Sequence, residues 1–208
     1  MKTLTQTERT QAKITPEKAI ELLKNGNKRF LENKLLHRDY HQQLDVTADA
    51  QYPFAAVLSC IDSRIPVEVV FDQGIGDMFS VRIAGNILND DILGSLEFAC
   101  KLSGTKAIVV MGHTSCGAVK GACDDAKLGN LTQMLDKIKP AIEQTATEDG
   151  EARNSGNIEF VNNVASKNVE LTIENIKSQS TVLKEMADNG EIAIVGAMYD
   201  VKTGLITF

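Results

Sequence analysis

The sequence has few cysteines, no surplus of positive charge and no long apolar run. Four cysteines in 208 residues are too few for a disulfide scaffold, so reduced thiols and a cytoplasmic location are expected. The formal net charge of -6 argues against a nucleic-acid-binding surface. No apolar run is long enough to span a bilayer, and residues 1–13 lack the apolar stretch of a signal peptide. We therefore expect neither nucleic acid nor membrane as a partner.

The length and the composition fit a single domain. The chain is 43% hydrophobic and 24% charged, as is usual for a globular protein of this size. It has no internal repeat and no linker rich in proline, glycine or serine. We expect one domain over 1–208, with an N-terminal helical arm at 1–50 and an α/β core at 51–208. Residues 147–156 are charged and contain glycine, which predicts a surface loop.

The arm contains one well-marked helix start. Thr15 caps it, Pro16 suits the first helical position, and Glu17 complements the positive end of the helix dipole. Apolar residues at helical spacing follow: Ile20, Leu23, Phe30 and Leu31. The sequence leaves open whether this arm packs on its own domain or on a partner subunit.

Apolar runs and turn residues predict the elements of the core. Strands are expected at 54–59, 77–83, 106–111 and 191–198. Helices are expected at 90–102, ended by Gly104, and from 117 onward. A turn at 200–204 returns residues 205–208 as an antiparallel edge strand. Strands that alternate with helices predict a mostly parallel central β-sheet flanked by helices, an α/β fold.

Side chains that bind metals follow two of these strands. Cys60 and Asp62 come after the strand at 54–59, and His113 and Cys116 come after the strand at 106–111. In open α/β sheets, ligands bind beyond the carboxyl ends of the strands. Two thiolates, an imidazole and a carboxylate suit zinc, which is borderline-soft and tetrahedral. The alternative interpretation, a buried structural cysteine and a hydrogen-bonded histidine, does not explain their joint placement.

Asp62 has a second possible partner. Arg64, two residues on, can pair with the carboxylate through two hydrogen bonds and compete with the metal for it. A catalytic zinc keeps one position for water, whereas a structural zinc has four protein ligands. Asp62 is therefore a conditional fourth ligand, and the pattern indicates a catalytic centre.

Four segments carry a family resemblance in the expected order and spacing: SCIDSR (59–64), VRIAGN (81–86), GHTSCG (112–117) and VGAMYDVKTGLITF (195–208). In them the sequence closely resembles the β-class carbonic anhydrases. The resemblance implies a zinc ion held by Cys60, His113 and Cys116, with Asp62 and Arg64 as catalytic residues. In such enzymes zinc-bound hydroxide attacks carbon dioxide, which gives bicarbonate and a proton.

The resemblance also implies substrate-binding residues and an oligomer. Gln51 would donate a hydrogen bond to a substrate oxygen from across a subunit interface, in a dimer or tetramer. Phe79, Ala84 and Phe98 would line the pocket for carbon dioxide. Family members often have valine in place of Ala84 and tyrosine in place of Phe98. Without the family, both phenylalanines are interpreted as core residues.

Some family members have a bicarbonate site that uses a tryptophan three residues before the first cysteine. This chain has Val57 there and no tryptophan at all. We therefore expect the always-open form, in which Asp62 pairs with Arg64 at neutral pH. Two other functions stay open: hydrolysis of a related linear molecule such as carbon disulfide, and a zinc-stabilised binding or redox-sensing module without turnover.

Overall fold

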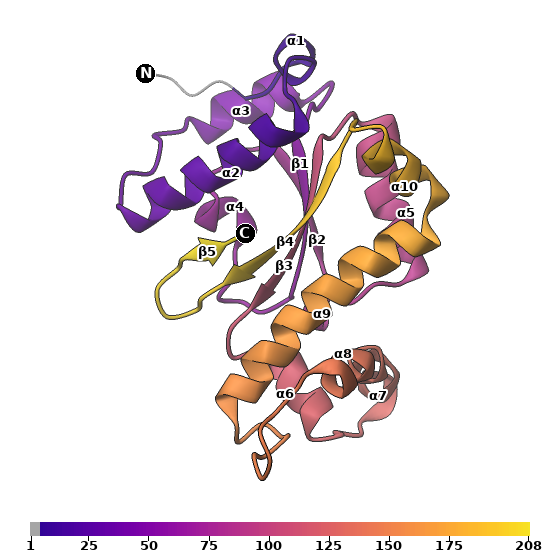
Figure 1. Cartoon of the computed structure of the whole chain (residues 1–208). Coiled ribbons are helices and arrows are strands. Elements are labelled where there is room, and N and C mark those ends of the chain that lie inside the picture. Colours follow the sequence, from indigo (N-terminus) through magenta and orange to yellow (C-terminus); the bar gives the residue numbers. More distant parts are fainter. Residues whose placement is uncertain (1–4) are drawn as a thin grey trace.

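The fold is built on one five-stranded sheet with the order β2-β1-β3-β4-β5. It is seen in a computed structural model that describes residues 5–208 (Figure 1). The strands are β1 (Ala55–Ser59), β2 (Met78–Arg82), β3 (Ala107–His113), β4 (Ala193–Tyr199) and β5 (Ile206–Thr207). Strands β1 to β4 pair in parallel, and β5 is antiparallel to β4. The predicted α/β fold with its antiparallel C-terminal edge is confirmed.

Helices precede, connect and cover the strands. They are α1 (Glu8–Gln11), α2 (Pro16–Leu31), α3 (Tyr40–Thr47), α4 (Val67–Val70), α5 (Asp90–Glu97), α6 (Gly117–Cys123), α7 (Gly129–Asp136), α8 (Lys139–Gln144), α9 (Ile158–Gln179) and α10 (Thr181–Asp188). A 3₁₀ turn spans Ala84–Asn86, and a π-helical turn at Phe98–Leu102 follows α5. Residues 147–156 form the predicted loop. Among the described residues, no helix is long and apolar enough to cross a membrane.

The core lies on both faces of the sheet, because successive strand residues point to opposite sides. Val57 of β1 packs in a cluster that includes Leu23 of α2. Leu58, the next residue, packs in the other cluster with Leu96 of α5 and Leu183 of α10. Figure 1 shows α2 and α4 on one side of the sheet and α5, α9 and α10 on the other. The central strands β1 and β3 are buried along their whole length, as their apolar sequences predicted.

Helix α2 packs on the core of its own chain. Thr15 caps it as predicted, by accepting a hydrogen bond from the Lys18 N–H. The buried Asn27 side chain donates to the Gly204 carbonyl oxygen at 2.9 Å and accepts from the Ile206 N–H at 3.0 Å. The helix therefore holds the edge strand β5 in place.

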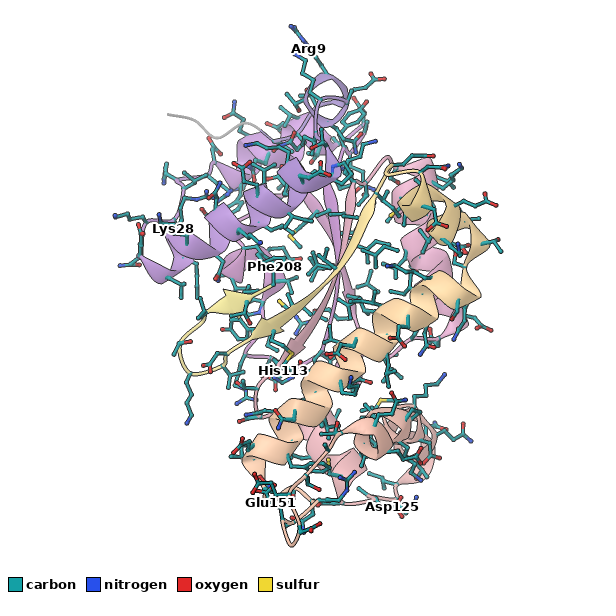
Figure 2. All side chains as sticks on the ribbon, viewed as in Figure 1. Arg9, Lys28, His113, Asp125, Glu151 and Phe208 are labelled. Carbon is teal, nitrogen blue, oxygen red and sulfur yellow. The ribbon has the colours of Figure 1, made fainter. Side chains whose placement is uncertain are left out.

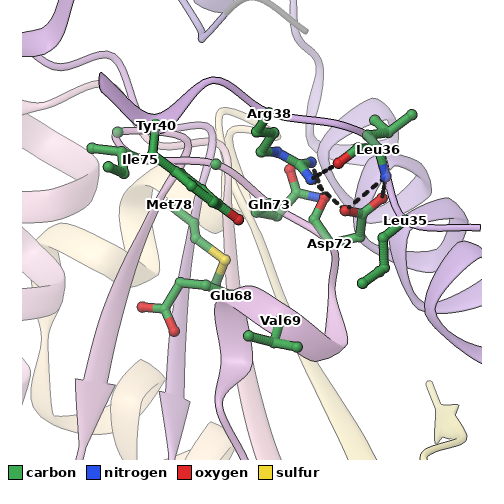
Figure 3. Close-up of a pocket in the computed structure, with 12 residues that line it drawn as sticks. Leu35, Leu36, Arg38, Tyr40, Glu68, Val69, Asp72, Gln73, Ile75 and Met78 are labelled. Atoms are coloured by element: carbon green, nitrogen blue, oxygen red, sulfur yellow. Dashed lines mark hydrogen bonds and ion pairs between the residues drawn. The ribbon is translucent and has the colours of Figure 1, made fainter. Parts of the chain in front are cut away.

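An ion-pair cluster ties the segment between α2 and α3 to the core. Arg29 and Arg38 both pair with Asp72, whose side chain is 2% exposed. Asp72 also accepts a hydrogen bond from the Leu36 N–H. Figure 3 shows Leu36, Arg38 and Asp72 of this cluster in the lining of a hollow between residues 35–40 and 68–78. The volume of the hollow is about 400 Å³. Because Asp72 is buried, the two arginines must stay in place to compensate its charge.

The longest helix, α9, was not predicted. Its buried face includes the polar residues Asn168 and Thr172, which interrupt the apolar stripe by which such a helix is recognised. The predicted helix at 90–102 is also divided, since α5 ends at Glu97 and a π-helical turn follows. The strand predicted to end at 111 continues to His113, which pairs with Tyr199 of β4.

Candidate metal centre

Three of the predicted ligands meet at the carboxyl ends of β1 and β3. Ser59 pairs with Met111, so the two strands end side by side. Cys60 follows β1, His113 is the last residue of β3, and Cys116 is the N-cap of α6. Figure 2 shows His113 at this edge of the sheet. The ligand atoms of these three residues, the Cys–His–Cys group, lie within 4.8 Å of one another, and all three residues are buried.

The imidazole of His113 has one satisfied nitrogen and one unsatisfied nitrogen. Nδ1 lies 3.0 Å from the carbonyl oxygen of Thr114, an arrangement in which Nδ1 carries the proton and donates it. Nε2 is buried and has no hydrogen-bond partner in the described part of the chain. A buried lone pair costs free energy unless it is satisfied, and a metal ion satisfies it. The residues present therefore fit a metal ion.

The two sulfur atoms favour a cation between them. Their separation is 4.0 Å, and the contact with Cys116, with help from His113 and the Gly85 N–H, lowers the pKa of the Cys60 thiol against the effect of burial. The same contact and burial raise the pKa of the Cys116 thiol. One thiol therefore loses its proton easily, whereas a second thiolate is repelled by the first. A divalent cation removes that repulsion and makes both sulfurs ligands.

Asp62 lies beside the Cys–His–Cys group and pairs with Arg64. The Arg64 Nε donates to Oδ1 at 2.9 Å and Nη2 donates to Oδ2 at 2.7 Å. These bonds hold the pKa of the Asp62 carboxyl well below its usual range. Oδ2 is 4.0 Å from the unsatisfied Nε2 of His113. The structure thus forms the pair expected from the sequence and leaves a charged carboxylate facing the histidine.

Sequence reasoning missed the residue that holds this loop. Arg82, the last residue of β2, donates from Nε to the Cys60 carbonyl oxygen at 3.1 Å and from Nη2 to the Asp62 carbonyl oxygen at 2.7 Å. Its position in the VRIAGN segment was a usable signal, because this segment and the cysteine segment lie at the carboxyl ends of neighbouring parallel strands.

The three residues expected to line one apolar pocket do not meet within one chain. Ala84 lines a hollow of about 280 Å³ beside Cys60 and Asp62, whose other walls come from α6 and α7. Phe79 and Phe98 lie together in another hollow, with their ring centroids 6.3 Å apart in an edge-to-face arrangement. The division follows from the fold, since Phe79 is on the edge strand β2 and Ala84 is on the turn after it.

Gln51 lies away from the Cys–His–Cys group of its own chain. It is exposed and precedes β1, whereas Cys60 follows β1, so the whole strand separates them. Gln51 instead lines a hollow with Thr47 and Gly76. Within one chain, this glutamine therefore contacts none of the other candidate site residues.

The fold and the site together define an α/β protein with a buried Cys–His–Cys group, suited to a metal ion, at the carboxyl ends of two parallel strands. The carbonic anhydrase family matches residues 55–206. The chain is 34% identical over 197 residues to carbonic anhydrase 2 of Mycobacterium tuberculosis, covering 91% of this chain and 90% of that protein. The chain belongs to the carbonic anhydrase family, in its β class.

Two further relatives bear on fold and specificity. The crystal structure of the β-carbonic anhydrase CafA of Aspergillus fumigatus superposes with a TM-score of 0.71 at 28% identity, covering 92% of this chain and 89% of that one. A carbon disulfide hydrolase of Acidithiobacillus thiooxidans is 33% identical over 98 residues, which is 44% of this chain and 45% of that protein.

Proposed function

We propose that this protein catalyses the reversible hydration of carbon dioxide to bicarbonate and a proton, with zinc held by Cys60, His113 and Cys116. One observation carries the proposal: the Asp62–Arg64 pair lies next to the Cys–His–Cys group, with Asp62 Oδ2 4.0 Å from His113 Nε2. A structural metal site would need no such neighbour. The β-carbonic anhydrase family of the chain supports the same reaction.

The chain's own residues have separate tasks in this reaction. Zinc, when bound, acts as a Lewis acid that makes water nucleophilic near neutral pH. The Asp62 carboxylate accepts a hydrogen bond from the attacking water and orients it toward the substrate. Arg64 holds both carboxylate oxygens at 2.9 and 2.7 Å, which keeps Asp62 charged and fixes its orientation beside the Cys–His–Cys group.

We propose that the substrate pocket is completed by a second copy of the chain. Ala84 is the predicted pocket residue that lies beside Cys60, whereas Gln51, Phe79 and Phe98 lie elsewhere on the same chain. If these three residues serve the reaction, they must reach the pocket of a partner. The protein is then at least a dimer, and its active site is shared between subunits.

The surface of the N-terminal segment supports this assembly. Five large apolar side chains within twelve residues are 40% to 61% exposed: Leu35, Leu36, Tyr40, Leu44 and Val46. Such a concentration is typical of a surface that another chain covers. A cytoplasmic location is also part of the proposal, because thiol ligands must stay reduced.

The test combines zinc analysis with stopped-flow measurement of carbon dioxide hydration. The wild-type protein is expected to hold about one zinc per chain and to hydrate carbon dioxide, and Cys60→Ala to lose both. Cys123→Ala is the matched control, since this half-buried cysteine lies outside the Cys–His–Cys group. Equal hydration rates for wild type and Cys60→Ala would contradict the proposal.

Carbon disulfide hydrolysis is the second candidate. It is favoured by the partial similarity to a carbon disulfide hydrolase over 98 residues, and both substrates are small linear molecules. Offering each substrate separately to the zinc-loaded protein distinguishes the two functions. We expect turnover of carbon dioxide; turnover of carbon disulfide alone would replace the first proposal with the second.

A further inference from the structure

Helix α9 lies unusually close to the end of the sheet that carries the Cys–His–Cys group. A Cβ placed on Gly112, the residue before His113, would come within 2.8 Å of Val169 Cγ2 and 3.4 Å of the Ala165 carbonyl oxygen. A Cβ on Gly196 of β4 would come within 2.8 Å of Val169 Cγ1. Glycines at these two positions therefore let the helix backbone pack directly against β3 and β4.

The first turns of α9 hold the loop that carries Cys116. The Asn162 Oδ1 accepts a hydrogen bond from the Ser115 N–H at 2.9 Å. Ser115 has a φ of 56°, in the left-handed region that a residue with a side chain seldom adopts. This turn lies between His113 and Cys116, so the hydrogen bond stabilises the backbone conformation that brings both ligands to one point.

A second asparagine of α9 holds the other side of the group. The buried Asn168 donates from Nδ2 to the Gly85 carbonyl oxygen at 2.8 Å. Gly85 has a φ of 69°, and its N–H donates to the Cys60 Sγ at 3.3 Å. Gly85 therefore links the two: its carbonyl oxygen is held by Asn168, and its N–H donates to the Cys60 sulfur.

We propose that Asn162 and Asn168 are positioning residues that set the Cys–His–Cys group for zinc from one rigid helix. One asparagine acts as an acceptor on the Ser115 turn and the other as a donor on the Gly85 turn. Neither touches a ligand atom directly, and each acts through one backbone group. The inference rests on the proposed function in that zinc is the metal to be bound.

The opposite hydrogen-bonding roles make a crossed test possible in the full-length protein. An aspartate at position 162 can still accept from the Ser115 N–H, whereas leucine cannot. An aspartate at position 168 cannot donate when ionised, and neither can leucine. Four variants are compared: Asn162→Asp, Asn162→Leu, Asn168→Asp and Asn168→Leu. The exposed neighbour Asn163 provides the controls Asn163→Asp and Asn163→Leu.

Zinc affinity by competition with a chromogenic chelator is the main measurement, and the sulfur-to-cobalt charge-transfer band of the cobalt-substituted protein is the second. We expect Asn162→Leu and both Asn168 variants to bind zinc about 10- to 100-fold more weakly and to shift the cobalt band. Asn162→Asp and the Asn163 variants should keep the wild-type values. The thermal midpoints of the zinc-free proteins separate these effects from a general loss of stability.

Two results would overturn the inference. One is an Asn162→Leu protein whose zinc affinity and cobalt band are unchanged. This variant is decisive because Asn162 is half-buried, so the fold tolerates its substitution better than that of the buried Asn168. The other is equal loss in Asn162→Asp and Asn162→Leu, which would rule out the acceptor role. A wild-type protein that binds no zinc would instead contradict the proposed function.

Discussion

The Asp62 carboxylate accepts two hydrogen bonds from the Arg64 guanidinium, from Nε to Oδ1 at 2.9 Å and from Nη2 to Oδ2 at 2.7 Å. The same Oδ2 lies 4.0 Å from His113 Nε2. Arginine thereby determines the direction in which this carboxylate points. A carboxylate without that partner would be free to turn to a cation bound by the Cys–His–Cys group, because zinc accepts aspartate readily. Activity and metal binding should therefore respond differently to changes in this pair.

Replacing Arg64 by lysine tests this difference. Lysine presents a point charge and cannot hold both carboxylate oxygens in a fixed geometry. We expect Arg64→Lys to keep its zinc and to lose about 10- to 100-fold in hydration rate. Stopped-flow rates and zinc analysis are compared with Arg9→Lys, an exposed control on α1. A fully active Arg64→Lys protein would show that the paired hydrogen bonds are dispensable.

The Asp62 pair should also contribute to stability in a pH-dependent way. Arg64 lowers the pKa of the Asp62 carboxyl in the folded chain, whereas an aspartate carboxyl in the unfolded chain has a pKa of about 3.9. The stabilisation is therefore complete above about pH 4 and is lost as the pH falls below it. Urea unfolding of the zinc-free protein should show Asp62→Asn less stable than wild type at pH 7, with the gap closing at lower pH.

The control for this measurement is Asp149→Asn, in an exposed loop. Its free energy of unfolding should track that of the wild type throughout. A gap between wild type and Asp62→Asn that widens on acidification would contradict the expected sign.

Mixing two inactive variants tests the shared active site. Gln51→Ala lacks the proposed substrate donor, and Cys60→Ala lacks a proposed zinc ligand. In a mixed dimer, one of the two sites is complete: the Gln51→Ala chain supplies its intact Cys–His–Cys group, and the Cys60→Ala chain supplies its intact Gln51. If subunits associate at random, about a quarter of all sites should be restored in a co-expressed mixture. No recovery in verified mixed dimers would place Gln51 outside the partner's site.

Two glycine substitutions should have opposite effects on stability. Gly112→Ala places a Cβ within 2.8 Å of Val169 Cγ2 and Met198 Sδ, so overpacking should cost about 1–3 kcal/mol. A Cβ added to Gly94, inside α5, would meet no heavy atom within 4 Å apart from its chain neighbours and its own helix backbone, so Gly94→Ala should stabilise by up to about 1 kcal/mol. The free energy of unfolding in urea is measured for both variants and for the wild type. A Gly112→Ala protein as stable as the wild type would mean that α9 can move away from β3.

Much of the core was predictable because its signals are local. The continuous apolar run at 54–59 became β1, and Thr15 caps α2 as its neighbours indicated. The candidate ligand residues were recognisable because they lie at the carboxyl ends of two continuously apolar strands. Helix α9 was not recognisable, because its buried face carries the asparagine and threonine side chains that interrupt its apolar stripe.

The sequence by itself determined the candidate site of this protein. Cys60, Asp62, Arg64, His113 and Cys116 are set by their residue types and by their spacing after apolar strands. Only the tertiary structure decided how they meet. It placed the two strand ends side by side, left His113 Nε2 without a partner among the described residues, and brought α9 against both ligand loops. It also separated Gln51 from Cys60 by the length of β1. These relationships depend on strand order and helix packing. Both bring together residues that are far apart in the chain, so no local sequence pattern predicts them.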